Sequence, residues 1–419
     1  MIPRRHFLGG AAALLASAAD TNPAIKAARD AALAVLRPSE KTLQHGLELH
    51  AASLVIESYG FSPRSAIDGA AMKRATEAGA GALELEDLYT EMLLMRVADD
   101  PSQQPEYRQA WQASGVTCVL QNAGEEGSSP LRLLKRLAHF TYLTDKLRGT
   151  VSRAAVPADI EAAKREGRHC LYLTGNGVPL AQEWNSTVEE LAYVRLFYQL
   201  GIRMMHLTYN RRNVLGDGCA EPANAGLSEL GRAAIAEMNR LGIIVDVAHS
   251  GWRTSLEAAQ ASTKPMVASH SAAVEMRRHI RAKPDEVIRA IADTGGYVGV
   301  YSVASFLGRS GDLNAMLDNI EYLVKKFGAD HVAIGTDLAY IPSTANAQWK
   351  LAGTRPKSRE RFEALWPPGA LTSQSHPSLA WTNWPMFTVG MVQRGISDSD
   401  IQKILGGNVL RVAKAVLPA

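Results

Sequence analysis

The chain has few cysteines and no long apolar run. Its 419 residues include three cysteines, Cys118, Cys170 and Cys219, and no CxxC pair. This spacing indicates neither a disulfide framework nor a zinc knuckle, and allows at most one disulfide. No uninterrupted apolar segment reaches the roughly 20 residues that a membrane-spanning helix needs. The body of the chain is therefore expected to carry no transmembrane segment.

An excess of charge of either sign is also missing. The sequence has 45 basic and 42 acidic residues, a formal net charge of +3, without the clustered basic stripe that is typical of a nucleic-acid surface. Hydrophobic residues make up 46% and charged residues 21% of the chain, as in ordinary globular proteins. We therefore expect a small peptide or amide as partner and no nucleic acid. The oligomeric state, with a homodimer as one option, is left open.

The first residues differ in kind from the rest. Arg4 and Arg5 precede a short alanine-rich apolar run that ends in Ala16-Ser17-Ala18, a small-residue cleavage pattern. This order predicts a twin-arginine export signal over residues 1–18 and an exported protein, periplasmic or extracellular. The alternative is a frayed basic terminus.

Short β-rich apolar runs alternate with helical patterns along the chain, which is typical of a parallel sheet covered by helices. A glycine-rich phosphate loop after the first run, expected in a doubly wound sheet, is absent. Eight strand–helix units instead predict an α/β fold of the (β/α)₈ TIM barrel type. The eight runs are residues 54–60, 115–123, 169–176, 201–210, 242–249, 265–271, 296–303 and 331–337.

The remaining segments are assigned around this barrel, which is expected to occupy residues 51–419. Residues 19–50 are predicted to form N-terminal helices that cap its bottom, with helical patterns over residues 22–50. Residues 341–384, rich in Pro, Ser and Trp, are expected to form a long loop or lid. A helical tail is predicted over residues 397–416.

Two strand runs carry a histidine at or next to their end, and one ends in aspartate. His249 and Asp337 are the last residues of the runs 242–249 and 331–337, and His270 is the last but one of the run 265–271. Catalytic residues of such barrels lie at the carboxyl ends of the strands. Imidazole and carboxylate groups that meet there are the ligand set of zinc or a similar ion, which activates water for hydrolysis. A single histidine at a strand end is more often a satisfied polar residue, but two histidines with an aspartate favour a metal or catalytic role.

Several motifs together carry a family resemblance. Residues 237–242 read EMNRLG, residues 246–249 read DVAH, residues 269–271 read SHS and residues 335–337 read GTD. Over about residues 54–408 the chain resembles the membrane (renal) dipeptidase family of the amidohydrolase superfamily. The resemblance implies a barrel with two zinc ions that hydrolyse dipeptides.

The family's roles are assigned to the matching positions. The resemblance implies that His249 and His270 bind the second zinc ion and that Asp337 lies at the first. Arg281 matches the arginine that holds the terminal carboxylate of the substrate, a role suited to a planar bidentate donor. Tyr209 replaces a substrate-contacting histidine and can still donate a hydrogen bond.

Three of the five metal positions of the family are changed. Tyr59 and Phe61 stand where the family has an HxD pair, and Gly175 stands where it has a bridging glutamate. We therefore expect one zinc ion or none instead of two. Because side chains of a strand alternate, Glu57 shares a face with Tyr59 and is a candidate replacement ligand; the alternative is that Glu57 faces a buried polar partner.

Two functions follow from this combination of retained and lost residues. The first is a metallohydrolase of a dipeptide or small amide, with Asp337 and Tyr209 in catalysis and Arg281 and Tyr59 in substrate binding. The second is an exported binding or accessory protein without catalysis, whose pocket has become more aromatic. Retention of His249 and His270 favours the hydrolase.

Overall fold

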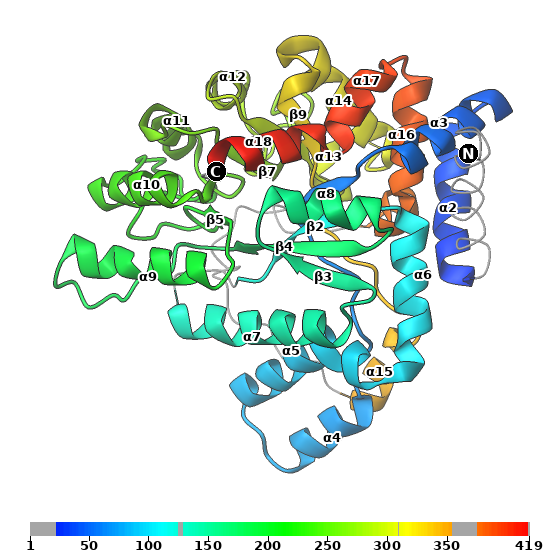
Figure 1. The fold of residues 1–419 in the computed structure, drawn as a ribbon, viewed down its shortest axis with the longest axis horizontal. Coiled ribbons are helices and arrows are strands. Elements are labelled where there is room, and N and C mark those ends of the chain that lie inside the picture. Colours follow the sequence, from blue (N-terminus) through cyan, green and yellow to red (C-terminus); the bar gives the residue numbers. More distant parts are fainter. Residues whose placement is uncertain (1–21, 125–128, 309, 354–374, 418–419) are drawn as a thin grey trace.

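A computed structural model of the chain describes residues 22–124, 129–308, 310–353 and 375–417. Within these residues, eight parallel strands form a ring with helices around it (Figure 1). In hydrogen-bonded order the strands are β1 (Ile56–Gly60), β2 (Cys118–Asn122), β4 (His169–Gly175), β5 (Met204–His206), β6 (Ile244–Asp246), β7 (Val267–Ser271), β8 (Tyr297–Val300) and β9 (Val332–Ile334). Each lies within one of the eight predicted runs, so the (β/α)₈ barrel is confirmed. The predicted export signal lies outside the described residues.

The ring closes between its first and last strands. The backbone N–H of Asp337, just after β9, donates to the carbonyl of Tyr59 in β1 at 3.2 Å. The N–H of Phe61 donates in return to the carbonyl of Leu338, also at 3.2 Å. These two bonds place the residues that follow β1 and β9 side by side at the carboxyl-terminal rim.

The amino-terminal end of the barrel is filled by α18 (Asn408–Val416), which follows the π-helical segment η6 (Lys403–Gly407) and the short helix α17 (Asp398–Gln402). Apolar residues of α18 share one buried cluster with inward side chains such as Ile56, Tyr172 and Met204. Asn408 Nδ2 donates to the carbonyls of Ala329 and Val332 at the start of β9, at 2.7 and 2.8 Å. The opposite, carboxyl-terminal end is the mouth.

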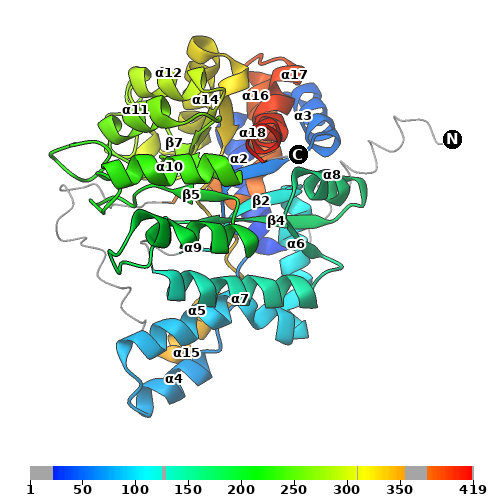
Figure 2. The same cartoon turned by 60° about the vertical axis from the view of Figure 1, so that its left-hand side comes forward.

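A layer of helices covers the outside of the ring, as Figures 1 and 2 show. These helices are α6 (Gln104–Ser114), α7 (Pro130–Lys146), α8 (Pro157–Arg165), α9 (Thr187–Gln199), α10 (Glu229–Leu241), α11 (Trp252–Ala261), α12 (Asp285–Asp293), α13 (Ala304–Leu307) and α14 (Leu313–Phe327). The sequence sets their ends: Ser228 caps α10 by accepting from the N–H of Gly231, and Gly242 ends it at a φ of 91°. Among the described residues, no helix is both long and apolar enough to span a bilayer.

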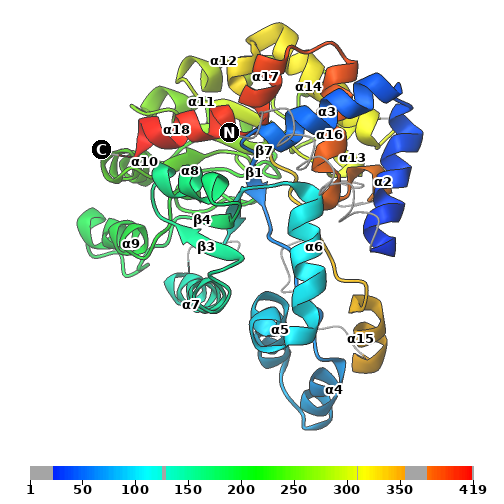
Figure 3. The same cartoon turned by 45° about the vertical axis from the view of Figure 1, so that its right-hand side comes forward.

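The N-terminal helices α2 (Pro23–Leu36) and α3 (Glu40–Ala52) pack against α16 (Trp384–Gln393) on one side of the barrel (Figure 3). Asn22 caps α2 by accepting from the N–H groups of Ala24 and Ile25. The 3₁₀ turns η4 (Pro377–Leu379) and η5 (Trp381–Asn383) lie under α2. Trp381 and Trp384 are buried, so both belong to the core.

A small projection of α4 (Gly69–Glu77), α5 (Ala82–Asp99) and α15 (Ala345–Ala352) extends from the mouth side of the barrel (Figure 3). Its own apolar cluster joins Ile67 and Met72 to Ala352. Helix α15 corrects the expectation of an irregular segment over residues 341–384, of which residues 354–374 lie outside the described part. A ninth strand, β3 (Val151–Ala154), pairs with the outer edge of β4 and was not predicted.

Candidate functional site

Three histidines meet at the mouth of the barrel. His206 ends β5, His249 follows β6 and His270 lies in β7, and all three are buried. One ring nitrogen from each lies within 4.8 Å of the other two. The Nε2 atoms of His249 and His270 are 2.9 Å apart. The structure thus brings together the two histidines expected from the sequence and adds a third.

The ring of His249 is fixed by its neighbours. Its Nδ1 lies 2.7 Å from Oδ1 of Asn210. An amide oxygen only accepts, so Nδ1 carries the proton and Nε2 keeps a lone pair. Asn210 holds this position in the left-handed region, at a φ of 57°, and its Oδ1 also accepts from Cys219 at 3.4 Å. The ring of Tyr209 stacks on His249 with centroids 4.1 Å apart.

His270 is held between a hydroxyl and an aromatic ring. Its Nδ1 lies 2.9 Å from Oγ of Ser269, and the ring of Tyr59 stacks on it with centroids 4.0 Å apart. The hydroxyl of Tyr59 donates to Oδ1 of Asn176 at 2.5 Å. Tyr59 therefore fills the position beside the histidines and orients His270.

His206 was not predicted from the sequence. The run 201–210 was assigned to end at Asn210, whereas the paired strand covers only residues 204–206, so the rim position belongs to His206. Its Nε2 lies 2.7 Å from Oδ2 of Asp246. Its Nδ1 has no hydrogen-bond partner among the described residues. The sequence does carry a signal for this residue, because a histidine directly follows the apolar pair Met204-Met205.

Burial and charge keep the imidazoles of His249 and His270 neutral. Burial, followed by the nearby guanidinium of Arg281, holds the pKa of His249 and of His270 well below the ordinary value. Burial alone would raise the pKa of Asp246, but His206 and the bonds from Ser269 hold it below its ordinary value. A carboxylate beside neutral imidazoles is the usual surrounding of metal-binding histidines.

Two cations lie beside the cluster. Arg281 is 4% exposed, and its Nε and Nη2 have no hydrogen-bond partner within the described part of the chain. Lys283 is fully buried and donates from Nζ to the carbonyl of Ser250 at 2.6 Å. Burial lowers the pKa of Lys283 to about 7. Arg281 thus offers unused donors next to the histidines, whereas Lys283 is engaged by the loop after β6.

The contacts of the Glu57 side chain differ from those of the Tyr59 side chain. Its Oε2 accepts from Nε1 of Trp381 at 2.6 Å, and its Oε1 accepts from the N–H of Thr336 at 3.1 Å. A register shift between Glu57 and Gly60 breaks the simple alternation that was assumed. Burial raises the pKa of Glu57 to about 8. These contacts are those of a buried polar residue with polar partners. They match the alternative interpretation of Glu57, in which it is not a metal ligand.

Asp337 lies at the same rim but outside the histidine group. Its backbone bonds to Tyr59, and its φ is 58°. The cluster of candidate ligands contains the three histidines and not Asp337. A role for Asp337 as a ligand or proton acceptor stays a prediction.

Two positions of the lost family ligands, Phe61 and Gly175, carry no ligand atom in their side chains. The guanidinium of Arg64 covers the ring of Phe61 at 4.5 Å from its centroid. A side chain at Gly175 would meet the carbonyl oxygen of Gly177 at 3.1 Å from its Cβ, so the backbone has closed in on this position. Phe61 and Gly175 therefore offer no side-chain ligand atom to an ion.

The histidine cluster does fit one divalent ion. Two nitrogens bound tetrahedrally by one zinc ion at roughly 2.0 Å lie about 3.3 Å apart, close to the 2.9 Å between His249 and His270. Neutral imidazoles suit zinc and similar transition metals, and neither ring nitrogen of the buried His206 makes a hydrogen bond within the described residues. His206, His249 and His270 are the residues that would hold such an ion.

Known proteins resemble the chain in sequence. The profile of the family described as "Membrane dipeptidase (Peptidase family M19)" matches residues 109–347. Dipeptidase tcpJ from Claviceps purpurea is 27% identical over 263 residues, which cover 62% of this chain and 53% of the relative. Dipeptidase aclJ from Aspergillus oryzae is 28% identical over 225 residues, which cover 52% and 46%. The chain thus spans about half the length of these curated relatives.

Solved structures share the fold over nearly the whole chain. An amidohydrolase from Pseudomonas aeruginosa is 24% identical with a TM-score of 0.64, covering 88% of this chain and 98% of that one. A metallo peptidase from Rhodobacter sphaeroides, liganded with a phosphinate mimic of the dipeptide L-Ala-D-Ala, is 17% identical with a TM-score of 0.60, covering 87% and 99%.

Proposed function

The chain belongs to the membrane dipeptidase family, peptidase family M19, and we propose that it hydrolyses a dipeptide or a related small amide with one divalent ion. The observation that carries this proposal is the convergence of three buried histidines at the barrel mouth. Three protein ligands are the normal set of a catalytic zinc site. His206 takes the place of the ligands that are missing at Tyr59, Phe61 and Gly175.

The three imidazoles are positioned for this role by fixed partners. Asn210 holds His249 through Nδ1, Ser269 and Tyr59 hold His270, and Asp246 holds His206. Partners of this kind fix the ring orientation and the tautomer of metal-binding histidines. A zinc ion bound there would supply a Lewis acid that lowers the pKa of water and polarises the scissile carbonyl.

The substrate is recognised through its carboxylate. Arg281 has two donor atoms without partners in the described structure and is almost wholly shielded from solvent, which matches the planar carboxylate of a peptide terminus. Tyr209, stacked on His249, donates a hydrogen bond to the bound peptide. Asp337 at the same rim accepts a proton during hydrolysis.

Export is part of the proposal. The Arg4-Arg5 pair and the Ala16-Ser17-Ala18 sequence direct the chain through twin-arginine export, with removal of residues 1–18. The twin-arginine route carries folded proteins, so the histidine site can take up its ion before export.

A hydrolysis assay tests the proposed function. Purified protein loaded with zinc is incubated with a panel of dipeptides, and the release of free amino acids is measured with and without a chelator. We expect turnover that requires the ion and is lost in His249→Ala and His270→Ala. Absence of both metal and turnover, together with dipeptide binding that requires Arg281, would instead support an accessory protein that has lost catalysis.

A further inference from the structure

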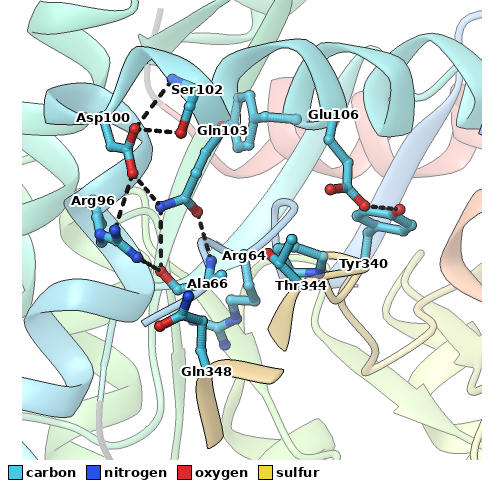
Figure 4. Close-up of a pocket in the computed structure, with 12 residues that line it drawn as sticks. Arg64, Ala66, Arg96, Asp100, Ser102, Gln103, Glu106, Tyr340, Thr344 and Gln348 are labelled. Atoms are coloured by element: carbon cyan, nitrogen blue, oxygen red, sulfur yellow. Dashed lines mark hydrogen bonds and ion pairs between the residues drawn. The ribbon is translucent and has the colours of Figure 1, made fainter. Parts of the chain in front are cut away.

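A cavity lies beside the barrel mouth, and none of the three histidines lines it. Its volume is about 160 Å³, and it opens between the segment after β1, helix α6 and the segment after β9 (Figure 4). The residues on its wall include Arg64, Arg96, Gln103, Tyr107, Tyr340 and Gln348.

Much of the polar wall is fixed by bonds within it. Arg96 pairs with Asp100 at 3.1 Å and donates to the carbonyl of Ala66. Gln103 binds the backbone of Ala66 through its side-chain oxygen at 2.7 Å. Figure 4 shows Asp100 directed at Ser102 and Gln103, and Glu106 at the hydroxyl of Tyr340. These groups shape the cavity and have limited capacity left for a ligand.

Two donors on the wall are unused. The guanidinium of Arg64 lies over the ring of Phe61 and has no acidic partner within 4 Å among the described residues. Burial, followed by the charge of Arg136, lowers the pKa of Arg64 to about 10. The hydroxyl of Tyr107 is in a residue only 3% exposed and has no hydrogen-bond partner in the described part of the chain. Burying the Tyr107 hydroxyl without a partner costs free energy that a bound acceptor would recover.

The size and the donors define the ligand. A cavity of roughly 150 Å³ accommodates benzene, so this one holds a molecule of about the size of a single amino acid. A guanidinium presents two parallel N–H groups to a planar carboxylate, and a phenol adds one further O–H donor. We propose that this cavity binds a small carboxylate through Arg64 and Tyr107.

The cavity is joined to the histidine cluster by a series of neighbouring aromatic side chains. Arg64 lies 4.5 Å from the centroid of Phe61, whose ring is 6.2 Å from that of Tyr59, which stacks on His270. The carboxylate site is thus a neighbour of the proposed catalytic site. It does not depend on hydrolysis, because it rests on its own cavity and donors.

Calorimetric titration tests this site with the full-length protein. The probes are propionate, L-alanine and L-alaninamide, which differ in whether they carry a carboxylate and an ammonium group. We expect propionate and alanine to bind and alaninamide not to bind. Arg64→Met should weaken carboxylate binding by roughly tenfold or more, and Tyr107→Phe by roughly two- to tenfold. Arg108→Met, an exposed arginine on α6, is the matched control and should bind as the parent protein does.

Arg281→Met separates this cavity from the catalytic site. Binding that survives Arg281→Met and is lost in Arg64→Met assigns the carboxylate to the cavity. The proposal is overturned if no carboxylate binds, if alaninamide binds as tightly as alanine, or if Arg281→Met abolishes binding while Arg64→Met retains it. Circular dichroism of each variant checks folding, and Tyr107→Phe keeps the test valid if Arg64→Met does not fold. Hydrolysis is measured separately, so either proposal can fail alone.

Discussion

The Nε2 atom of His206 lies 2.7 Å from Oδ2 of Asp246, and both side chains are completely shielded from solvent. Oδ1 of the same carboxylate accepts from the backbone N–H groups of Ala248 at 2.9 Å and Ser269 at 3.1 Å. The carboxylate is therefore anchored to the backbone at one oxygen and faces His206 with the other. Neither ring nitrogen of His206 makes a hydrogen bond within the described residues. A proton on Nε2, which faces the carboxylate, would leave the lone pair of Nδ1 for an ion.

Replacement of Asp246 by asparagine should weaken metal binding. In Asp246→Asn the oxygen can keep the backbone bonds, but the amide N–H₂ then faces His206 and favours a proton on Nδ1. We expect the dissociation constant for zinc, measured by competition with a chromogenic chelator, to rise roughly 10- to 100-fold. Asp159→Asn on α8 is the control and should leave it unchanged. An unchanged constant in Asp246→Asn would remove His206 from the ligand set.

Replacement of Arg281 should reduce turnover of substrates that carry a free carboxylate. Loss of a charge-assisted bidentate contact lowers kcat/KM by roughly 10- to 100-fold in Arg281→Met. The C-terminal amide of the same dipeptide should be affected much less, because it lacks the charge that Arg281 binds. Equal losses for the acid and the amide would contradict a carboxylate-binding role.

Glu57 should affect stability and leave the metal content unchanged. Its pKa is raised to about 8 by burial, so the folded state favours the protonated carboxyl. Its contribution to the free energy of unfolding is complete below the unfolded pKa of about 4.5 and is lost as the pH rises through about 8, a change of about 5 kcal/mol at most. Denaturant unfolding across this range should show a decline in stability that Glu57→Gln flattens. A loss of bound zinc in Glu57→Gln would show that Glu57 is a metal ligand.

Export should depend on the paired arginines. Substitution of both Arg4 and Arg5 by lysine should retain the protein in the cytoplasm, because the twin-arginine route requires the pair. Cell fractionation followed by N-terminal sequencing measures both location and cleavage after Ala18. Continued export and processing of the double variant would show that the protein is exported by a signal other than the arginine pair.

The sequence was sufficient for the barrel and for two of the three histidines. Each of the eight strands lies within one of the short β-rich runs of the sequence, and these runs are local patterns that can be recognised without knowledge of long-range contacts. His249 lies just after β6, and His270 lies near the end of β7. These local signals needed no information about distant parts of the chain.

The remaining features depend on details that periodicity does not encode. His206 was missed because the strand ends earlier than its apolar pattern, and the chain turns at Asn210 in the left-handed region. Glu57 was expected to share a face with Tyr59, but a register shift separates their contacts. The projection is held by contacts between α4 and α15, which are far apart in the sequence.

The metal content of the purified protein tests the central claim most directly. Plasma emission spectroscopy after zinc loading and removal of free zinc should give one ion per chain, and close to none in His206→Gln, His249→Gln and His270→Gln variants whose circular dichroism matches the parent. Two ions per chain, no ion in the parent protein, or one ion retained in a folded His206→Gln variant would contradict the three-histidine site.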